Sequence, residues 1–138
     1  MMRFLVLFLT ISAGVSPVCA NLGDGDDKID VSYGDLVERH LRDDGTVSTL
    51  YQKNPYRYLV VFDNQMSVLE KYSRVDGKDL SEKEIAKFLR ANAGRTAKWA
   101  SATSKEGRVF ERSDHKAEAT CDKENNRLTL TVRMVGGK

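Results

Sequence analysis

The sequence predicts an α+β domain in which two helices lie on one face of an antiparallel β-sheet, arranged as a tandem repeat of a helix followed by a β-meander. The first observation is that segment 81–94 carries helix start and stop signals around an apolar stripe. Another is the last strand-like segment, 127–135, in which apolar and polar residues alternate. A third is that the helix signals recur 49 residues apart. Helices and half-apolar strands bury their apolar sides against each other, which gives this two-layer class.

Residues 1–20 are typical of a secretory signal peptide. Arg3 precedes an apolar run, and Val18 and Ala20 are small residues at the positions that a signal peptidase recognises. The run is too short to span a membrane, so we expect cleavage after Ala20, export to the periplasm or the medium, and no membrane insertion afterwards. The alternative is a lipoprotein anchored at Cys19, because bacterial lipoproteins begin at a cysteine that follows an apolar run.

The mature chain that this cleavage predicts has 118 residues and nearly balanced charge. It loses one of the 22 basic residues and none of the 20 acidic ones, so the formal net charge falls from +2 to +1. Neither nucleic acid nor a membrane surface is therefore predicted as a partner. This length predicts a single domain, over 31–138. Cys121 is the one cysteine left, which excludes a disulfide-framed toxin or inhibitor.

Residues 21–30 are rich in glycine and aspartate and carry little apolar surface. We therefore expect a flexible acidic lead-in to the domain. Its aspartates do not match a calcium-binding loop. Such a loop starting at Asp24 would need an oxygen ligand at Lys28 and a glycine at Ile29.

A helix is predicted from Ser81 to Gly94. Ser81 is a favourable N-cap, and Glu84 three residues later can close a capping box. Gly94 supplies the left-handed residue that commonly follows a helix. The apolar face contains Ile85, Phe88 and Leu89, and Leu80 before the cap is spaced to pack against Ile85.

A second helix is predicted to begin at Ser32, because residues 31–36 repeat the start signals of residues 80–85. The two repeat units then cover about 31–75 and 80–135. The 49-residue offset pairs Val31 with Leu80, Ser32 with Ser81, Asp35 with Glu84, Leu36 with Ile85, Gly45 with Gly94, and Leu50 with Trp99. Leu50 and Trp99 are accordingly expected in the core.

Strands are predicted after each helix. Segments 56–62 and 66–72 form a hairpin around Asp63-Asn64-Gln65. Segments 108–112, 116–121 and 127–135 form a meander joined by turns rich in Asp, Asn and Ser. Residues 59–62 are apolar on both faces, which indicates a central strand or one covered by a terminal segment.

Alternation assigns the side chains of the last two strands to faces. The last strand places Leu128, Leu130, Val132 and Met134 inward and Arg127, Thr129, Thr131 and Arg133 outward. Its neighbour places Ala117, Ala119 and Cys121 inward and Glu118, Thr120 and Asp122 outward. The predicted sheet therefore has one packed face and one polar face.

The predicted layout resembles that of exported bacterial α+β domains of the β-lactamase-inhibitor-protein and outer-membrane-assembly-lipoprotein types, which also place helices on one face of an antiparallel meander. The chain is also similar to small exported bacterial domains that carry a pattern such as Leu80-Ser81-x-x-Glu84-Ile85 followed by a short Gly94-to-Trp99 segment. Neither resemblance implies a catalytic residue.

Few residues are candidates for chemistry. His40 falls on the inward side of the predicted second helix, where a partly buried structural histidine is expected, and His115 falls in a turn. Two histidines and one cysteine without ligand spacing do not predict a metal site. Cys121 has no histidine near it in sequence and is expected to be a buried, inert thiol. We therefore predict no catalytic, cofactor-binding or metal-binding residue and do not expect an enzyme.

The function that the sequence favours is a noncatalytic protein-binding or inhibitory module with an unknown protein partner. The predicted contact surface is the polar sheet face, centred on Thr129, Thr131, Arg133, Glu118 and Thr120. A second candidate surface is an aromatic and basic cluster that includes Tyr51, Tyr56, Arg57 and Tyr58. An envelope structural or assembly component is the alternative, and an enzyme is the least favoured class.

Overall fold

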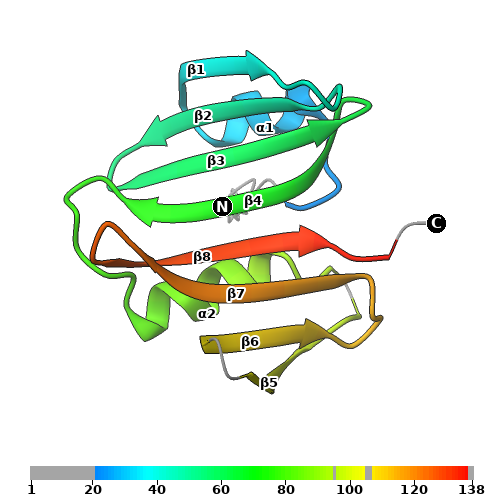
Figure 1. Ribbon diagram of the computed structural model, residues 1–138, viewed down its shortest axis with the longest axis vertical. Coiled ribbons are helices and arrows are strands. Elements are labelled where there is room, and N and C mark those ends of the chain that lie inside the picture. Colours follow the sequence, from blue (N-terminus) through cyan, green and yellow to red (C-terminus); the bar gives the residue numbers. More distant parts are fainter. Residues whose placement is uncertain (1–20, 95, 105–106, 137–138) are drawn as a thin grey trace, which may run out of the picture.

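The computed structural model describes residues 21–94, 96–104 and 107–136. Those residues form an α+β fold with two helices and one eight-stranded antiparallel sheet, in the strand order β1-β2-β3-β4-β8-β7-β6-β5 (Figure 1). The elements are α1 (Asp26–Ser32), β1 (Asp35–Leu41), β2 (Val47–Lys53), β3 (Tyr56–Asp63), β4 (Met66–Arg74), α2 (Glu82–Ala91), β5 (Trp99–Ser104), β6 (Gly107–Arg112), β7 (Ala117–Glu124) and β8 (Arg127–Met134). The predicted signal peptide at 1–20 and the alternative lipid anchor at Cys19 lie outside the described residues.

Both helices pack on the same face of the sheet. Figure 1 shows α1 behind β1 to β3 and α2 behind β7 and β8. One apolar core joins them to the strands: it contains Ile29 of α1, Phe88 of α2, and Tyr51, Val60 and Leu130 of the sheet. The core therefore lies between the helices and one sheet face, as the sequence predicts.

Helix α2 follows its sequence signals closely. The Ser81 hydroxyl accepts a hydrogen bond from the Glu84 amide, and the Glu84 carboxylate accepts one from the Ser81 amide, which completes the capping box. Ile85, Phe88 and Leu89 are buried, together with Leu80 before the cap. Because Gly94 adopts a left-handed φ of 71°, the chain turns away soon after the helix ends.

The prediction of a second helix from Ser32 to Gly45 is wrong. Ser32 is the last residue of α1, and the following residues form β1. Gly34 separates the two elements with a φ of +85°, and a Cβ there would lie 2.8 Å from the Gln52 carbonyl oxygen. This close approach of β1 to β2 requires glycine, so the helix signal at Ser32 is overridden by the strand pairing that follows. The 49-residue correspondence pairs β1 with α2 and does not describe the fold.

The lead-in predicted as flexible is part of the folded domain. Residues 26–30 belong to α1, and Ile29 is completely buried in the core. The Gly23 amide donates to the Ser67 carbonyl, and the Ser67 amide donates to the Asp24 carbonyl, so the segment is hydrogen-bonded to β4. The complete burial of Ile29, the one apolar residue among these aspartates, is enough to hold the segment against the core.

The predicted hairpin and meander are confirmed. β3 pairs with β4 through a turn at Asn64 and Gln65, and β7 pairs with β8 through a turn at Asn125 and Asn126. All four turn residues have positive φ, between 49° and 66°, which is the geometry of a two-residue hairpin turn. β3 lies between β2 and β4, so its apolar residues on both faces mark an internal strand.

Strands β1, β2 and β5 are not among those that the sequence predicts. β2 pairs with β3 over its whole length, and Leu50, expected in the core, lies opposite Leu59 on the face away from the helices. Thr49 and Tyr51 on either side of it are the buried residues. Trp99, also expected in the core, is half-buried against it, and its indole N–H donates to the Leu89 carbonyl over 2.6 Å. The core position that the 49-residue correspondence with Trp99 predicts for Leu50 is therefore wrong.

Candidate functional site

The face of the sheet opposite the helices, called here the open face, carries the polar row that the sequence predicts. Directly opposite residues on antiparallel strands point to the same face. The register pairs Leu50 with Leu59, Leu59 with Lys71, Lys71 with Thr131, and Thr131 with Thr120. The open face thus runs without interruption across β2, β3, β4, β8 and β7.

Four of the five residues at the predicted centre of this face are at least partly exposed. Thr131 lies opposite Thr120, and Arg133 lies opposite Glu118. The Arg133 guanidinium donates to the Glu118 carboxylate, with 2.6 Å between Nε and Oε1. These two strands therefore present a threonine pair and a charged pair side by side.

Thr129, the fifth residue, differs from the prediction because it is only 1% exposed. Its hydroxyl donates to the Asp122 carbonyl over 3.1 Å. Its side chain therefore offers almost no surface of its own for contact with a partner.

The second candidate surface, around Tyr56 and Tyr58, is not on the open face. The Tyr58 ring stacks on the Tyr33 ring with 4.1 Å between centroids, and the Tyr56 ring meets the Phe88 ring edge-on at 5.0 Å. Tyr58 and Tyr51 are buried, and Tyr56 is half-buried beside α2 with its hydroxyl on Glu84. Strand alternation separates these tyrosines from Arg57, which lies on the open face, so the predicted cluster does not form.

A hollow of about 220 Å³, which the sequence does not predict, lies on the open face. We call it the basic hollow. It is lined by Leu50, Arg57, Leu59, Lys71, Ser73, Glu124, Arg127 and Thr129. These residues come from five strands, β2, β3, β4, β7 and β8. Three of them are cations and one is a carboxylate, so the hollow combines an excess of positive charge with aliphatic walls.

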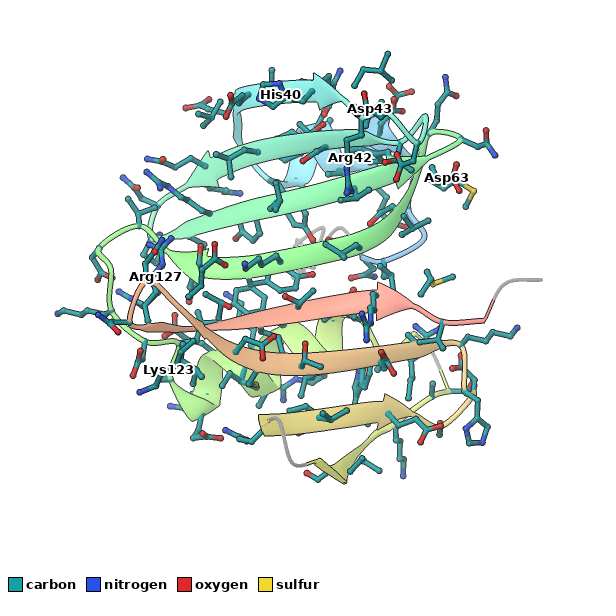
Figure 2. The ribbon with its side chains drawn as sticks, viewed as in Figure 1. His40, Arg42, Asp43, Asp63, Lys123 and Arg127 are labelled. Carbon is teal, nitrogen blue, oxygen red and sulfur yellow. The ribbon has the colours of Figure 1, made fainter. Side chains whose placement is uncertain are left out.

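The polar groups of the basic hollow are incompletely paired. Lys71 forms an ion pair with Glu124. In the part of the chain that the structure describes, Arg127, which is labelled in Figure 2, donates from Nη1 to the Arg74 carbonyl at 3.1 Å, and its buried Nε has no hydrogen-bond partner. Burial lowers the pKa of the Lys71 ammonium and the Arg127 charge acts in the same direction, whereas Asp122 opposes both. The Lys71 and Arg127 charges therefore lie close enough to repel each other.

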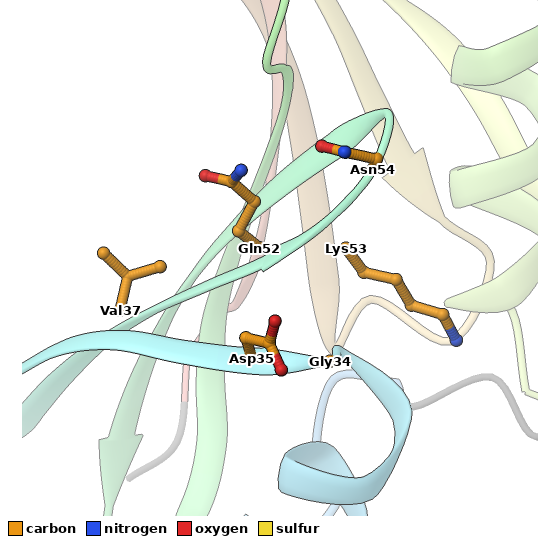
Figure 3. A pocket seen from close by; sticks show the side chains of 6 residues that line it. All are labelled: Gly34, Asp35, Val37, Gln52, Lys53 and Asn54. Carbon is orange, nitrogen blue, oxygen red and sulfur yellow. The ribbon is translucent and has the colours of Figure 1, made fainter.

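A second hollow, of about 440 Å³, lies at the β1 edge of the sheet and is lined by Gly34, Asp35, Val37, Gln52, Lys53 and Asn54. Figure 3 shows that Lys53 and Val37 extend toward opposite sides, so these side chains do not converge on one point. A binding site requires convergent polar groups, and this hollow does not supply them.

The packed face contains a buried carboxylate. Glu70 of β4 has no exposed surface and accepts hydrogen bonds from the hydroxyls of Tyr33, Ser67 and Tyr72. Asn92, the C-cap of α2, donates to the Tyr72 hydroxyl over 2.8 Å. This network joins β4 to the end of α1 and the end of α2, and burial raises the pKa of the Glu70 carboxyl.

The two histidines and Cys121 lie on different elements. His40 was expected on the inward side of a helix, but it is exposed on the edge strand β1 beside Glu38 (Figure 2). His115 is an exposed turn residue beside Glu111. Cys121 is buried in β7, as expected, and burial raises the pKa of its thiol. Within the described ranges no group of three or more His, Cys, Asp or Glu side chains could hold a metal ion.

No protein-family model, curated protein or solved structure matches this chain. Across residues 21–94, 96–104 and 107–136, neither helix has the length and apolar character needed to cross a membrane.

Proposed function

We propose that the protein is an exported, noncatalytic binding or inhibitory module that contacts a protein partner through the open face of its sheet. One observation supports this most directly: both helices pack on the other face, so within the described residues a continuous five-stranded surface is left uncovered. Such a surface is broad and shallow, and this shape suits another protein better than a small molecule.

The side chains of the open face support the same proposal. Thr120 and Thr131 are stiff β-branched residues, so they lose little conformational entropy on contact. Leu50, Leu59 and Leu69 are half-exposed and add apolar area. Arg133 can form bidentate hydrogen bonds with a partner carboxylate in place of those it makes to Glu118.

The second candidate function, an envelope structural or assembly component, is favoured by a different observation. β1 is an edge strand whose seven residues are all exposed, and Leu36, Val37 and Leu41 are among them. An unpaired strand edge with exposed apolar residues can pair with a strand of another chain.

We also infer that the two halves of the chain are related by a repeat whose spacing differs from the predicted one. Each half has a helix followed by four strands, and each ends in a hairpin with a two-residue turn of positive φ. β3 and β7 begin at Tyr56 and Ala117, and β4 and β8 begin at Met66 and Arg127, so both pairs are 61 residues apart. The strand order also places the two hairpins next to each other at the centre of the sheet.

The binding proposal is tested by substituting Thr131 and Arg133 together. Thr131→Ser with Arg133→Gln should leave the fold intact, because both side chains are partly or fully exposed and exposed ion pairs contribute little stability. Affinity capture of a partner from the lysate of the source cells should be weaker with this variant than with the unchanged protein. The matched control is Lys83→Ser with Arg90→Gln on the exposed side of α2, which should capture normally. Equal capture by both variants would contradict the placement of the surface.

A further inference from the structure

We propose that the basic hollow receives a carboxylate side chain from an acidic segment of the protein that docks on the open face. This inference rests on the proposed function and adds the chemistry of the partner. The hollow lies within the same surface, because Lys71 is paired with Thr131 across β4 and β8.

The first argument is the local charge. The whole chain is nearly balanced, with 22 basic and 20 acidic residues. The basic hollow departs from that balance: Arg57, Lys71 and Arg127 line it, against Glu124 alone. Cations gathered in a partly desolvated hollow attract an anion more strongly than the same charges spread over the surface.

The second argument is that donors in the hollow remain unused. In the described part of the chain, Arg57 makes one long hydrogen bond, from Nε to the Gln52 side chain at 3.4 Å, which leaves both of its terminal amino groups free. A carboxylate placed in the hollow could accept hydrogen bonds from these two amino groups of Arg57.

The third argument is size. The basic hollow measures about 220 Å³. Pockets for drug-sized ligands are larger, at roughly 300–1,000 Å³. One aspartate or glutamate side chain fits the smaller space, with its methylene groups against Leu50 and Leu59 and its carboxylate among the cations. A side chain delivered by a docked protein suits this geometry better than a free metabolite does.

Glu124 occupies the place that the incoming carboxylate would take. It lies at the end of β7, its side chain is 47% exposed, and it pairs with Lys71. Docking would therefore displace the Glu124 side chain into solvent, and Lys71 would pair with the partner's carboxylate instead. A negative charge at position 124 opposes binding, so its removal should strengthen binding.

Hexaglutamate peptide is a suitable probe, and its binding to the full mature protein can be followed by NMR titration at fixed salt. We expect Arg57→Gln to weaken hexaglutamate binding about tenfold and Glu124→Gln to strengthen it about threefold. The matched control is Arg90→Gln, because Arg90 is an exposed arginine of α2, which packs on the other face of the sheet. It should change the dissociation constant by less than about twofold. Hexaglutamine peptide should not bind.

Several outcomes would overturn the proposal. Equal weakening by Arg90→Gln and Arg57→Gln would indicate diffuse electrostatic attraction. Glutarate or inorganic phosphate binding as tightly as hexaglutamate would indicate a small-anion site. If Arg57→Gln does not fold, as judged by its NMR spectrum, the result for Glu124→Gln decides. Partner capture that still depends on Thr131 and Arg133, while the hollow variants have no effect, would refute this inference and leave the proposed function standing.

Discussion

At the scale of single residues, Glu70 shows most clearly how the core constrains the chain. Its carboxylate is completely buried and is surrounded by the hydroxyls of Tyr33, Ser67 and Tyr72. The hydrogen bonds favour the charged form, but the loss of hydration outweighs them and raises the pKa of Glu70. The charge of Asp24, in the segment bonded to β4, raises it further. A network of this kind specifies how both helices meet β4 and makes stability depend on pH.

Stability should therefore fall as the pH rises above the ordinary carboxyl pKa of 4.5. In that range the folded chain retains a proton on Glu70 that the unfolded chain has lost, so the unfolded state binds fewer protons. Glu70→Gln keeps the shape and removes the titration. Between pH 5 and pH 7 the unchanged protein should lose unfolding free energy relative to this variant, as measured by urea denaturation. Parallel pH profiles for the two proteins would show that Glu70 has an ordinary pKa.

At the scale of elements, the sequence predicted those parts whose signals are local. The sequence of α2 carries an N-cap, a capping box and an apolar stripe within one stretch. The strands β3, β4, β7 and β8 have long alternating or apolar runs on either side of clear turns. β1 could not be predicted as a strand, because an exposed edge strand has no buried face to impose alternation. Its capping-like start at Ser32 then gave a false helix. α1 was missed because seven residues with one buried side chain give no periodic pattern.

The two serines that the sequence treated as equivalent should respond differently to substitution. Ser81→Ala removes the side-chain acceptor of the capping box and should lower the free energy of unfolding by about 1 kcal/mol. Ser32→Ala removes a hydrogen bond from the Ser32 hydroxyl to the Lys28 carbonyl at the end of α1, which is an exposed interaction. It should change stability by less than about 0.5 kcal/mol. Chemical denaturation of both variants checks this, and equal losses would argue that Ser32 caps a helix after all.

At the scale of the whole molecule, the face of the candidate site could be predicted, but its most distinctive feature could not. Alternation within β7 and β8 placed Thr120, Thr131 and Arg133 on the open face because side-chain direction is a property of one strand. The basic hollow needs the strand order: Arg57, Lys71 and Arg127 come together only because β4 pairs with both β3 and β8. Such long-range pairing leaves no mark on the local sequence.

The central claim, that a protein partner docks on the open face, is tested most directly by site-specific photo-cross-linking. Benzoylphenylalanine would replace Thr131 on the open face, Lys83 on α2 or Val37 on the edge strand β1, all of them partly or fully exposed. We predict that irradiation in the source-cell extract gives an adduct with one protein from position 131 and none from position 83 or 37. Adducts from position 83 alone would contradict the claim, and adducts from position 37 alone would favour an assembly role for β1 in its place.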